Sequence, residues 1–497
     1  MQVYLLFSLL VVVVSLFFSC DKKTQVNHSE KTFDSLLVMQ KESWNLPGVV
    51  LGIIKNDEVV YSKAFGVRGI DTNDSLTVKS VFHMASVSKP FVATAIMQLV
   101  EDGKVELDGR LIDYVPYFKM ADDRYKLITI RHILNHSSGI PDVEDYEWHK
   151  PQYDDGAAER YAQSFVDTYL DFNPGTQYSY SNAAFDILAN VISRASGMTF
   201  EEYMKKNIFE PAGMKNSTFF KPEVPEELAT KPHVLGDSLQ ITVSEVYPYN
   251  RRHAPSSTLN SNVEDMLKWA QVNLNKGEIN GNRIYSELSY DLLTQPQFKA
   301  EGRDSICLSW FAHKLGDYRV VNHGGGDTGY LTDFAFIPGM NAALVMMANN
   351  DFYWSGDASR ILLQKLVLER IEKEWQIPIH YKLKDYILDE GIEKCKEVYF
   401  KEKKDNPEKY VFEGRYLDEF GYQLLYRGHK KEALQIFKFH VELEPDNATY
   451  AESLAEGYLA LNETEEAIKW YQKAVEINPD QEYSKKKLME LRINDKE

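Results

Sequence analysis

The feature that most constrains the fold is the placement of strand-like segments at both ends of the first 375 residues. Two such segments, 49–55 and 58–65, are joined by Asn56-Asp57, a dipeptide typical of tight hairpin turns. Four more follow a long helix-like stretch, at 306–313, 318–323, 330–337 and 342–348. Antiparallel strands from both ends of a chain can form one sheet, with the intervening helices as a subdomain on one side. The sequence therefore predicts an α+β fold, with a cleft between sheet and subdomain as the natural ligand site.

Helices are predicted where apolar residues recur three and four positions apart. They are expected at 31–45, 89–101, 128–135, 183–196, 199–208, 262–275 and 357–374. Together with the strands they predict one domain over residues 31–374, which a polar segment at 21–30 precedes. Because 497 residues are too many for a single hydrophobic core, we expect further structure beyond this domain.

The C-terminal part of the chain repeats itself with a period of 34 residues. The matched pairs are Gly421/Ala455, Leu424/Tyr458, Ala433/Ala467, Phe437/Tyr471 and Pro445/Pro479. Small residues at helix crossings and a proline after the second helix resemble the tetratricopeptide repeat. The resemblance implies all-α repeats at 411–490 that bind a protein partner, and an unrelated four-helix tail is the alternative.

The stretch between the two units, 375–410, is charged and lacks a clear apolar pattern. We expect a helical linker here, with a helix at 383–400. Two repeats bury little surface by themselves, so we expect them to pack on this linker helix or on the first domain.

The N-terminal residues 3–18 are apolar throughout and end at Ser19-Cys20. This run is shorter than the about 20 residues of a membrane span and is typical of a signal peptide. A small residue before a cysteine resembles a bacterial lipoprotein cleavage site, which predicts a signal peptide at 1–20 and lipidation of Cys20. No Lys or Arg precedes the run, and Phe17 stands where such sites usually carry Leu, so plain secretion or an uncleaved anchor stays open. Each alternative predicts an exported protein of the cell envelope, and lipidation would anchor it in the membrane.

Charge and cysteine content exclude several classes of function. A net charge of −18 makes nucleic acid an improbable partner, because phosphate binding needs clustered Lys and Arg. Cys307 and Cys395 fall in different predicted domains, which favours two buried free thiols over a disulfide. No Cys/His spacing indicates a structural zinc site, and we expect no metal and no cofactor.

A Ser-x-x-Lys pattern places a hydroxyl and an amine on one face of a helix, one turn apart. The pattern starts at Ser19, Ser86 and Ser484, but only Ser86 follows an apolar segment and opens an apolar helix. The N–H groups at a helix N-terminus would favour the negative charge that develops on a carbonyl oxygen under attack. This predicts Ser86 as a nucleophile with Lys89 beside it. In the alternative, Ser88 caps the helix and Ser86 is a turn residue.

Two further motifs carry polar chemistry. Tyr180 and Asn182 are two positions apart on an expected extended segment, so their side chains should point the same way. The alternative is that Ser181 or Asn182 merely caps the following helix. His323 is followed by Gly324, Gly325 and Gly326 after the strand at 318–323, and glycines there allow a ligand backbone to approach closely. A Gly-rich turn that binds nothing is the alternative.

The order and spacing of these motifs resemble the active-site serine penicillin-recognising superfamily. The similarity is greatest to class C β-lactamases, D-specific peptidases and related carboxylesterases, and it covers residues 31–374. Further agreeing segments are 128–141, Pro174-Gly175, 263–266 and 323–330. His136 and Ser137-Ser138 invite a Ser–His interpretation, but the chain contains no Gly-x-Ser-x-Gly elbow, and the resemblance makes this stretch scaffold.

The resemblance implies a mechanism. Ser86 attacks a carbonyl carbon, Tyr180 and Lys89 carry its proton to the leaving group, and Asn182 orients Lys89 and the substrate. The oxyanion would lie between the backbone N–H groups of Ser86 and Gly326, and water would then cleave the acyl-enzyme. Either a neutral Lys89 or an ionised Tyr180 could act as the base, and the sequence does not decide between them.

The chain departs from class C β-lactamases at His323, where those enzymes carry Lys. Histidine is mainly neutral at pH 7, so a fixed positive charge for a substrate carboxylate is lost. We therefore expect a peptidase or amidase acting on D-amino-acid or other peptide bonds, or a carboxylesterase, ahead of a β-lactamase. The alternative is a catalytically idle scaffold whose repeats bind a protein. Loops 141–178 and 223–257 are expected to flank the cleft.

Overall fold

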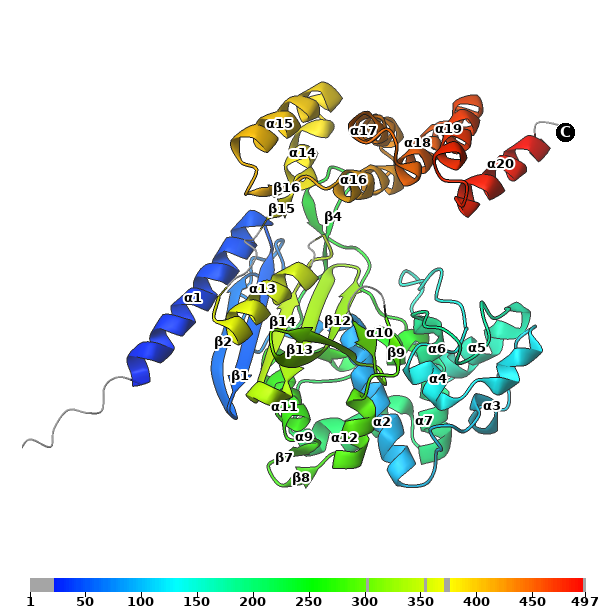
Figure 1. Ribbon diagram of the computed structural model, residues 1–497. Helices are drawn as coiled ribbons and strands as arrows, with labels where there is room; N and C mark the ends of the chain where they lie inside the picture. The colour runs from blue at the N-terminus through cyan, green and yellow to red at the C-terminus, as the bar shows by residue number, and fades with distance from the viewer. Residues whose placement is uncertain (1–21, 301–303, 353–354, 371–375, 495–497) are drawn as a thin grey trace, which may run out of the picture.

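The computed structural model describes residues 22–300, 304–352, 355–370 and 376–494 (Figure 1). In this part of the chain, eight strands form one antiparallel sheet in the order β2-β1-β14-β13-β12-β11-β10-β9. Their bounds are β1 Gly48–Lys55, β2 Glu58–Gly66, β9 Phe298–Lys299, β10 Ser305–Ile306, β11 Phe311–Leu315, β12 Tyr318–Asp327, β13 Tyr330–Ile337 and β14 Ala342–Ala348. Val49 pairs with Ala348, so strands from both ends of the domain lie side by side in one sheet, which confirms the α+β prediction.

Both faces of the sheet are covered by helices, and the central strand β14 is buried along its whole length. Val345 and Met347 pack in one cluster with α11 (Val263–Leu274), whereas Leu344 and Met346 pack in another with α1 (Lys22–Ser43) and α13 (Ser355–Leu368). Successive strand residues point to opposite faces, which is why an unbroken apolar run is needed here. Gly52 of β1 lets α11 approach, because an added Cβ would lie 2.5 Å from Val263 Cγ2.

The helical subdomain lies on one side of the sheet (Figure 1). Its helices are α2 Ser88–Glu101, α3 Leu111–Tyr114, α4 Ile130–Leu134, α5 Ala157–Gln163, α6 Asn182–Asp186, α7 Leu188–Ser196, α8 Phe200–Met204, α9 Glu210–Ala212, α10 Ala254–Ser257 and α12 Glu287–Thr294. Short strand pairs join its loops: β3 Phe82–His83 with β6 Asn260–Ser261, β4 His233–Leu235 with β5 Ile241–Val243, and β7 Glu278–Ile279 with β8 Asn282–Arg283. Helix α2 packs against both parts and is buried on most sides.

Several predicted boundaries were wrong. The first helix begins at Lys22, inside the segment that we expected only to be polar. The helix expected at 183–196 is interrupted at Ile187, and the helix expected at 199–208 continues past Met204 as a π-helical turn. The strand expected at 306–313 is two strands, because a turn closed by the N–H of Cys307 on the carbonyl of Trp310 separates β10 from β11.

The C-terminal part consists of helical hairpins above the sheet (Figure 1). Its elements are β15 Ile377–Pro378, α14 His380–Ile387, α15 Gly391–Asp405, β16 Tyr410–Val411, α16 Gly414–Tyr426, α17 Lys430–Leu443, α18 Ala448–Ala460, α19 Thr464–Ile477 and α20 Glu482–Asn494. Helices α16, α18 and α20 start 34 residues apart, as do α17 and α19. Gly421 permits the crossing of α16 and α17, since an added Cβ would lie 2.3 Å from the Phe437 ring. The all-helical prediction fits, and the tetratricopeptide assignment stays a prediction.

The expected linker is part of the core. The predicted helix at 383–400 is broken between α14 and α15, and the statement that 376–410 lacks an apolar pattern was wrong. Leu383 and Tyr399 are buried in the cluster that continues from the outer face of the sheet. Trp44 packs edge-on against Tyr381, with ring centroids 4.3 Å apart. The C-terminal helices therefore rest on the first domain, as the small size of two repeats required.

Candidate active site

Ser86 lies in a 3₁₀ turn, Ala85–Val87, between β3 and α2. It is partly exposed, whereas its neighbours on both sides are buried. Ala85 adopts a left-handed backbone conformation with φ of 48°, a strained arrangement for a residue with a Cβ. The hydroxyl of Ser88 accepts a hydrogen bond from Leu259 N at 3.0 Å, and the cap position of α2 is Val87. The alternative in which Ser88 caps the helix was therefore wrong.

Lys89 is fully buried, one helical turn from Ser86. Its Nζ lies 2.9 Å from Ser86 Oγ, 2.6 Å from Asn182 Oδ1 and 2.7 Å from the carbonyl oxygen of Ser256. Burial lowers the pKa of Lys89 to about 7, against the opposing effect of nearby carboxylates. A substantial fraction of this amine is therefore uncharged near neutral pH.

The three contacts of Lys89 can be made by an uncharged amine as well as by an ammonium group. Asn182 Oδ1 and the Ser256 carbonyl can only accept hydrogen bonds, so they take the two N–H groups of a neutral amine. The lone pair is then left for the hydroxyl proton of Ser86. Such an arrangement is what a general base beside a nucleophile requires.

Tyr180 lies on the other side of the nucleophile. The Lys89 Nζ lies 4.9 Å from its ring centroid, and the Ser86 hydroxyl is close enough to act on the pKa of its phenol. Burial raises the pKa of Tyr180 above its ordinary value, which keeps the phenol protonated at neutral pH. His136 stacks on this ring at 4.1 Å and accepts a hydrogen bond from Ser181 N at 3.2 Å. His136 thus supports the Tyr180 segment, in agreement with the scaffold expectation.

Asn182 is the first residue of α6, but it does not cap the helix. The hydroxyl of Ser181 takes that role by accepting from Ala184 N at 3.0 Å. Asn182 Nδ2 donates to Asp142 Oδ2 at 3.1 Å, and its backbone N donates to Asp142 Oδ1 at 2.6 Å. Because a carboxylate only accepts, Asp142 fixes the amide with its oxygen toward Lys89. Asp142 was not identified from the sequence, because it is one of several acids in its loop.

A buried chain of polar groups holds the Ser256 carbonyl in place. Arg252 Nε donates to His253 Nε2 at 2.9 Å, so His253 Nδ1 is the nitrogen that donates to Asp186 Oδ2 at 2.6 Å. Asp186 Oδ1 in turn accepts from Ser256 N at 3.1 Å. Sequence reasoning missed all four residues. Ser256 contacts Lys89 through its backbone, so no side-chain pattern could have indicated it.

The glycines after His323 are part of a strand, which corrects the expectation that the strand ends at residue 323. Gly324, Gly325 and Gly326 belong to β12 and pair with Asp333, Thr332 and Leu331 of β13. Gly325 packs against the nucleophile turn, because an added Cβ would lie 2.5 Å from Met84 O and 3.0 Å from Ser86 N.

The end of β12 also has a free edge. Its pairing with β11 ends at Asn322 opposite Phe311, so the strand extends beyond its neighbour from His323 to Asp327. Gly324 and Gly326, on the opposite face from Gly325, are exposed. Backbone groups on such an edge are available to a ligand.

His323 is buried, with 2% of its surface exposed. Its Nδ1 lies 2.6 Å from the carbonyl oxygen of Gly324, which only accepts, so Nδ1 carries the proton. Nε2 has no hydrogen-bond partner among the described residues. Burial lowers the pKa of His323 to about 3, so the ring is neutral at physiological pH.

The predicted flanking loops approach the site from one side. Tyr146 stacks on Trp148 at 4.7 Å, and both rings contact the edge of His253. An ion pair of 2.8 Å between Arg252 and Glu147 fixes this loop to the 251–257 segment. The 141–178 and 223–257 loops therefore contact each other beside Asp186 and Ser256.

Other predicted features have no place in this site. Cys20 and the apolar run before it lie outside the described residues. Cys307 and Cys395 are buried free thiols in the part of the chain that the structure describes. Among the same residues, no group of three or more His, Cys, Asp or Glu side chains is arranged to hold a metal ion. None of the described helices combines the length and apolar character that a membrane span requires.

Comparisons with known proteins agree with this geometry. The chain is 24% identical over 336 residues to Protein flp of Staphylococcus aureus, covering 65% of this chain and 64% of that protein. It is 26% identical to Penicillin-binding protein 4* of Bacillus subtilis, covering 66% of this chain and 73% of the relative. For Penicillin-binding protein 4 of Amycolatopsis lactamdurans the identity is also 26%, covering 71% and 93%. The chain thus spans slightly less than two thirds of the first of these relatives.

Solved structures share the fold. The octameric penicillin-binding protein homologue from Pyrococcus abyssi superimposes with a TM-score of 0.63 and 25% identity, over 69% of this chain and 78% of that one. A penicillin-binding protein from Bacillus halodurans gives a TM-score of 0.56 and 24% identity, over 67% and 98%. The family model described as Beta-lactamase matches residues 33–369. With the sheet, the helical subdomain and the Ser86 site all inside that range, the chain belongs to the Beta-lactamase family.

Proposed function

We propose that the protein is a serine hydrolase that cleaves amide or ester bonds through an acyl-enzyme on Ser86. The observation that carries this proposal is the 2.9 Å contact between Ser86 Oγ and the buried amine of Lys89. A serine hydroxyl at its ordinary pKa needs a base within hydrogen-bond reach, and this contact supplies one.

Each step of the proposed reaction balances its protons. Ser86 Oγ forms a bond to the substrate carbonyl carbon while its proton passes to Lys89 Nζ. The bond to the leaving group then breaks, and the proton passes from Lys89 through the hydroxyl of Tyr180 to the leaving atom. A water molecule repeats the sequence on the ester: its oxygen bonds to the acyl carbon, and its proton returns to Ser86 Oγ as the acid departs.

Lys89 is favoured over Tyr180 as the base. The pKa of Lys89 is lowered to about 7, which leaves about half of the amine uncharged at pH 7. The pKa of Tyr180 is raised above its ordinary value, so ionisation of the phenol is disfavoured. In this assignment the phenol relays a proton between Ser86 and the leaving group and does not carry a charge itself.

The oxyanion is assigned to the backbone N–H groups of Ser86 and Gly326. Asp327 and Tyr330 flank the two-residue turn between β12 and β13. In such a hairpin the two residues that flank the turn, here Asp327 and Tyr330, hydrogen-bond to each other through their backbones. Backbone N–H groups of successive strand residues point to opposite edges of the strand. The N–H of Gly326 therefore points away from β13, toward the free edge of β12. The contact of Gly325 with the Ser86 turn brings that edge next to the nucleophile. Two aligned N–H donors would stabilise the tetrahedral intermediate.

The substrate class follows from the relatives and the site together. Relatives named as penicillin-binding proteins support amide or ester substrates such as D-amino-acid peptides, and a neutral His323 argues against a dedicated β-lactamase.

A cell-envelope location, with a lipid anchor at Cys20, is part of the same proposal. It rests on the apolar run before Cys20.

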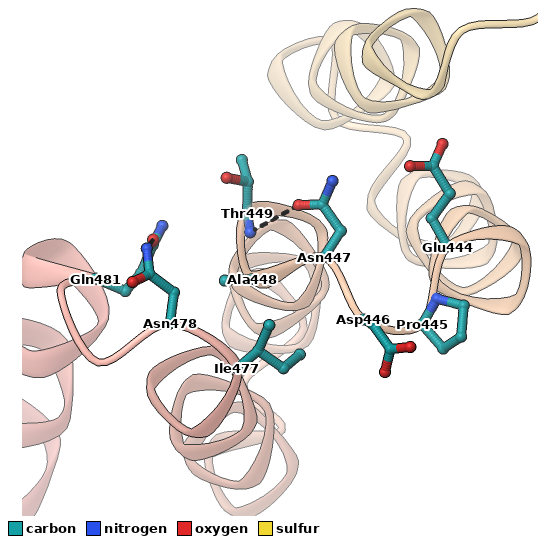
Figure 2. Close-up of a pocket in the computed structure, with 9 residues that line it drawn as sticks. All are labelled: Glu444, Pro445, Asp446, Asn447, Ala448, Thr449, Ile477, Asn478 and Gln481. Atoms are coloured by element: carbon teal, nitrogen blue, oxygen red, sulfur yellow. Dashed lines mark hydrogen bonds between the residues drawn. The ribbon is translucent and has the colours of Figure 1, made fainter.

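We further propose that the C-terminal repeats bind a protein partner. A pocket of about 550 Å³ opens between the α17–α18 and α19–α20 connections (Figure 2). Its lining is Glu444, Pro445, Asp446, Asn447, Ala448, Thr449, Ile477, Asn478 and Gln481. Six of the nine lining residues have polar side chains, and the apolar ones are Pro445, Ala448 and Ile477, so this pocket suits a polar peptide segment more than an apolar helix.

Turnover assays test the hydrolase proposal. Purified protein and a Ser86→Ala variant are offered a short acyl ester, a D-Ala-D-Ala peptide and a chromogenic cephalosporin. We expect turnover of the ester or the peptide by the wild type and none by the variant. Absence of turnover of all three by both proteins would favour the idle-scaffold alternative, in which only the repeats act.

A further inference from the structure

The turn between β12 and β13, residues 328–329, contacts a hairpin that the C-terminal helices hold. We propose that Arg427, at the end of α16, is a positioning residue for the proposed hydrolase reaction: through the β4–β5 hairpin and Asp351 it fixes this turn, and with it the N–H of Gly326. The inference rests on the proposed serine hydrolase function. It also goes beyond that function, because Arg427 lies outside the residues 33–369 that the family model matches.

The end of β12 depends on support at its tip. Pairing with β11 ends at Asn322, so over residues 323–327 the strand is held along one edge, by β13. A strand with one neighbour has half of the ladder hydrogen bonds of a central strand. Gly326 lies three positions before Gly329 of the turn, so a shift of the turn moves the proposed oxyanion donor relative to Ser86.

The base of the β4–β5 hairpin packs directly on this turn. Gly329 has a positive φ of 74°, and an added Cβ would lie 2.2 Å from Pro232 Cβ and 2.7 Å from His233 N. Contact this close leaves no space for the turn to move toward the hairpin. The position of the hairpin therefore determines the position of the turn.

The segment after β14 binds both the turn and the hairpin. Asp351 Oδ2 accepts from Gly329 N at 3.1 Å, and Asn349 O accepts from His233 Nδ1 at 2.8 Å. His233 Nε2 accepts from Ile70 N at 3.1 Å, so each ring nitrogen has one defined role. The turn, the hairpin and the 349–351 segment therefore form one hydrogen-bonded unit.

Arg427 joins this unit to the C-terminal helices. Its Nε donates to Leu235 O of β4 at 3.0 Å, and its Nη1 donates to Gln423 O of α16 at 2.9 Å. Figure 1 shows the hairpin reaching from the sheet to this helix. Two positions further on, His429 Nε2 donates to Asp237 O in the same hairpin. The end of α16 thus holds the hairpin at two backbone carbonyls.

Arg427 also acts on the segment after β14 through its charge. Burial lowers the pKa of Arg427, whereas the carboxylates of Asp351 and Asp237 raise it, so both carboxylates lie near the guanidinium. A guanidinium keeps its charge at ordinary pH. Arg427 therefore reaches two of the three parts of the unit that holds the turn.

Adhesion of the C-terminal helices does not require this cation. Leu235 and Leu239 of the hairpin are buried in the same apolar cluster as Leu424 of α16, and burial of such side chains supplies the attraction. A half-buried guanidinium loses part of its hydration, which offsets much of what its hydrogen bond contributes. The directional bond from Arg427 therefore fixes where the hairpin lies more than how tightly the helices bind.

The test compares an oxygen ester with its thiono analogue on the full chain. In the thiono ester C=S replaces C=O, and sulfur is a weaker acceptor for N–H donors placed around an oxyanion. We expect Arg427→Ala to lower kcat/KM by about tenfold for the oxygen ester and by less than about threefold for the thiono ester. A smaller folded fraction would lower both values equally, so an unchanged ratio would contradict a positioning role.

Arg415→Ala is the matched control. Arg415 lies in the same helix, is exposed and pairs with Glu413, so its removal makes the same change of charge away from the hairpin. Both kcat/KM values should stay within about twofold of the wild type. If Arg427→Ala does not fold, His429→Ala removes the neighbouring contact and should change the ratio in the same direction. An unchanged ratio in that variant would equally contradict the inference.

A double-mutant cycle tests whether Arg427 acts through the turn. Asp351→Ala removes the acceptor of Gly329 N. Because both residues hold one turn, the double variant should lose less kcat/KM for the oxygen ester than the product of the two single losses. Losses that multiply would show independent action and would overturn the inference.

Labelling of Ser86 with a fluorophosphonate separates this inference from the proposed function. Labelling of the wild type, together with the same oxygen-to-thiono ratio in wild type and Arg427→Ala, would overturn the inference and leave the hydrolase proposal standing. Absence of both labelling and turnover in the wild type would overturn both.

Discussion

The amine of Lys89 lies 2.7 Å from the carbonyl oxygen of Ser256, a residue 167 positions further along the chain. This contact ties helix α2 to helix α10, which Asp186 holds in place through Ser256 N. Since a carbonyl oxygen only accepts, it fixes the direction of one amine hydrogen and helps to aim the lone pair at Ser86. The basicity and the orientation of Lys89 are therefore properties of the whole domain and not of one helical turn.

The rate should depend on pH through Lys89. Because the base is the uncharged amine, kcat/KM is expected to rise with pH through an apparent pKa of about 7 and then level off. The carboxylate of Asp327 favours the charged form of Lys89 and so raises its pKa. Asp327→Asn should therefore shift the rise of kcat/KM to lower pH. A pH profile of ester hydrolysis measures both. A limb near pH 10, or a shift in the opposite direction, would contradict the assignment of Lys89 as base.

The same pKa predicts a stability effect. In the unfolded chain Lys89 regains an ordinary pKa near 10.5, so between pH 7 and 10.5 the unfolded state binds more protons than the folded state. The free energy of unfolding should therefore rise with pH in that window, by about 2 kcal/mol from pH 7 to 9 from this group. Lys89→Met removes the contribution of this amine to the pH dependence of the free energy of unfolding. Urea denaturation of both proteins at several pH values should give a shallower pH slope for the variant, and equal slopes would argue against a depressed pKa.

The contact of β12 with the nucleophile turn can be tested with two neighbouring glycines. Gly325→Ala would place a Cβ 2.5 Å from Met84 O, so the strand must shift away from Ser86. We expect a loss of about 1–3 kcal/mol in stability and of about 100-fold in kcat. Gly324→Ala is the matched control, because its Cβ would meet nothing closer than Thr332 O at 3.9 Å. Equal effects of the two variants on ester hydrolysis would show that the approach of Gly325 is unimportant.

Sequence patterns indicated four side chains that the fold brings together. Ser86, Lys89, Tyr180 and Asn182 converge as the motif spacing implied, with Lys89 Nζ 2.6 Å from Asn182 Oδ1. The central strands were predicted well because β14 is apolar on both faces. Backbone groups such as the Ser256 carbonyl could not be predicted, because every residue carries a carbonyl and only the fold brings this one to Lys89.

The glycine segment was misjudged for a related reason. Glycine has a low strand propensity, so three in a row after His323 indicated that the strand ends there. The segment nevertheless pairs with β13 along its length, because tertiary contact with the Ser86 turn requires a surface without side chains. Asp142 was overlooked because acids are frequent in its loop, and only the fold brings one of them to Asn182.

Asp142 is expected to position Asn182. Asp142→Ala removes the acceptors of both Asn182 N and Asn182 Nδ2, so the amide can rotate and lose its contact with Lys89. We expect kcat to fall by roughly 10- to 100-fold with a smaller change in KM, since misplacement of a supporting group acts mainly on the chemical step. Glu144→Ala, at an exposed acid of the same loop, is the control and should leave kcat unchanged. Steady-state kinetics of the two variants separates loss of positioning from loss of loop charge.

The most direct measurement is the mass of the protein after reaction with a fluorophosphonate, followed by mapping of the modified peptide. Here the predicted result is one adduct per chain, on Ser86, formed more slowly at pH 6 than at pH 8 and absent from Ser86→Ala. An unmodified wild-type protein, or an adduct on another residue that persists in Ser86→Ala, would contradict the claim that Lys89 activates Ser86.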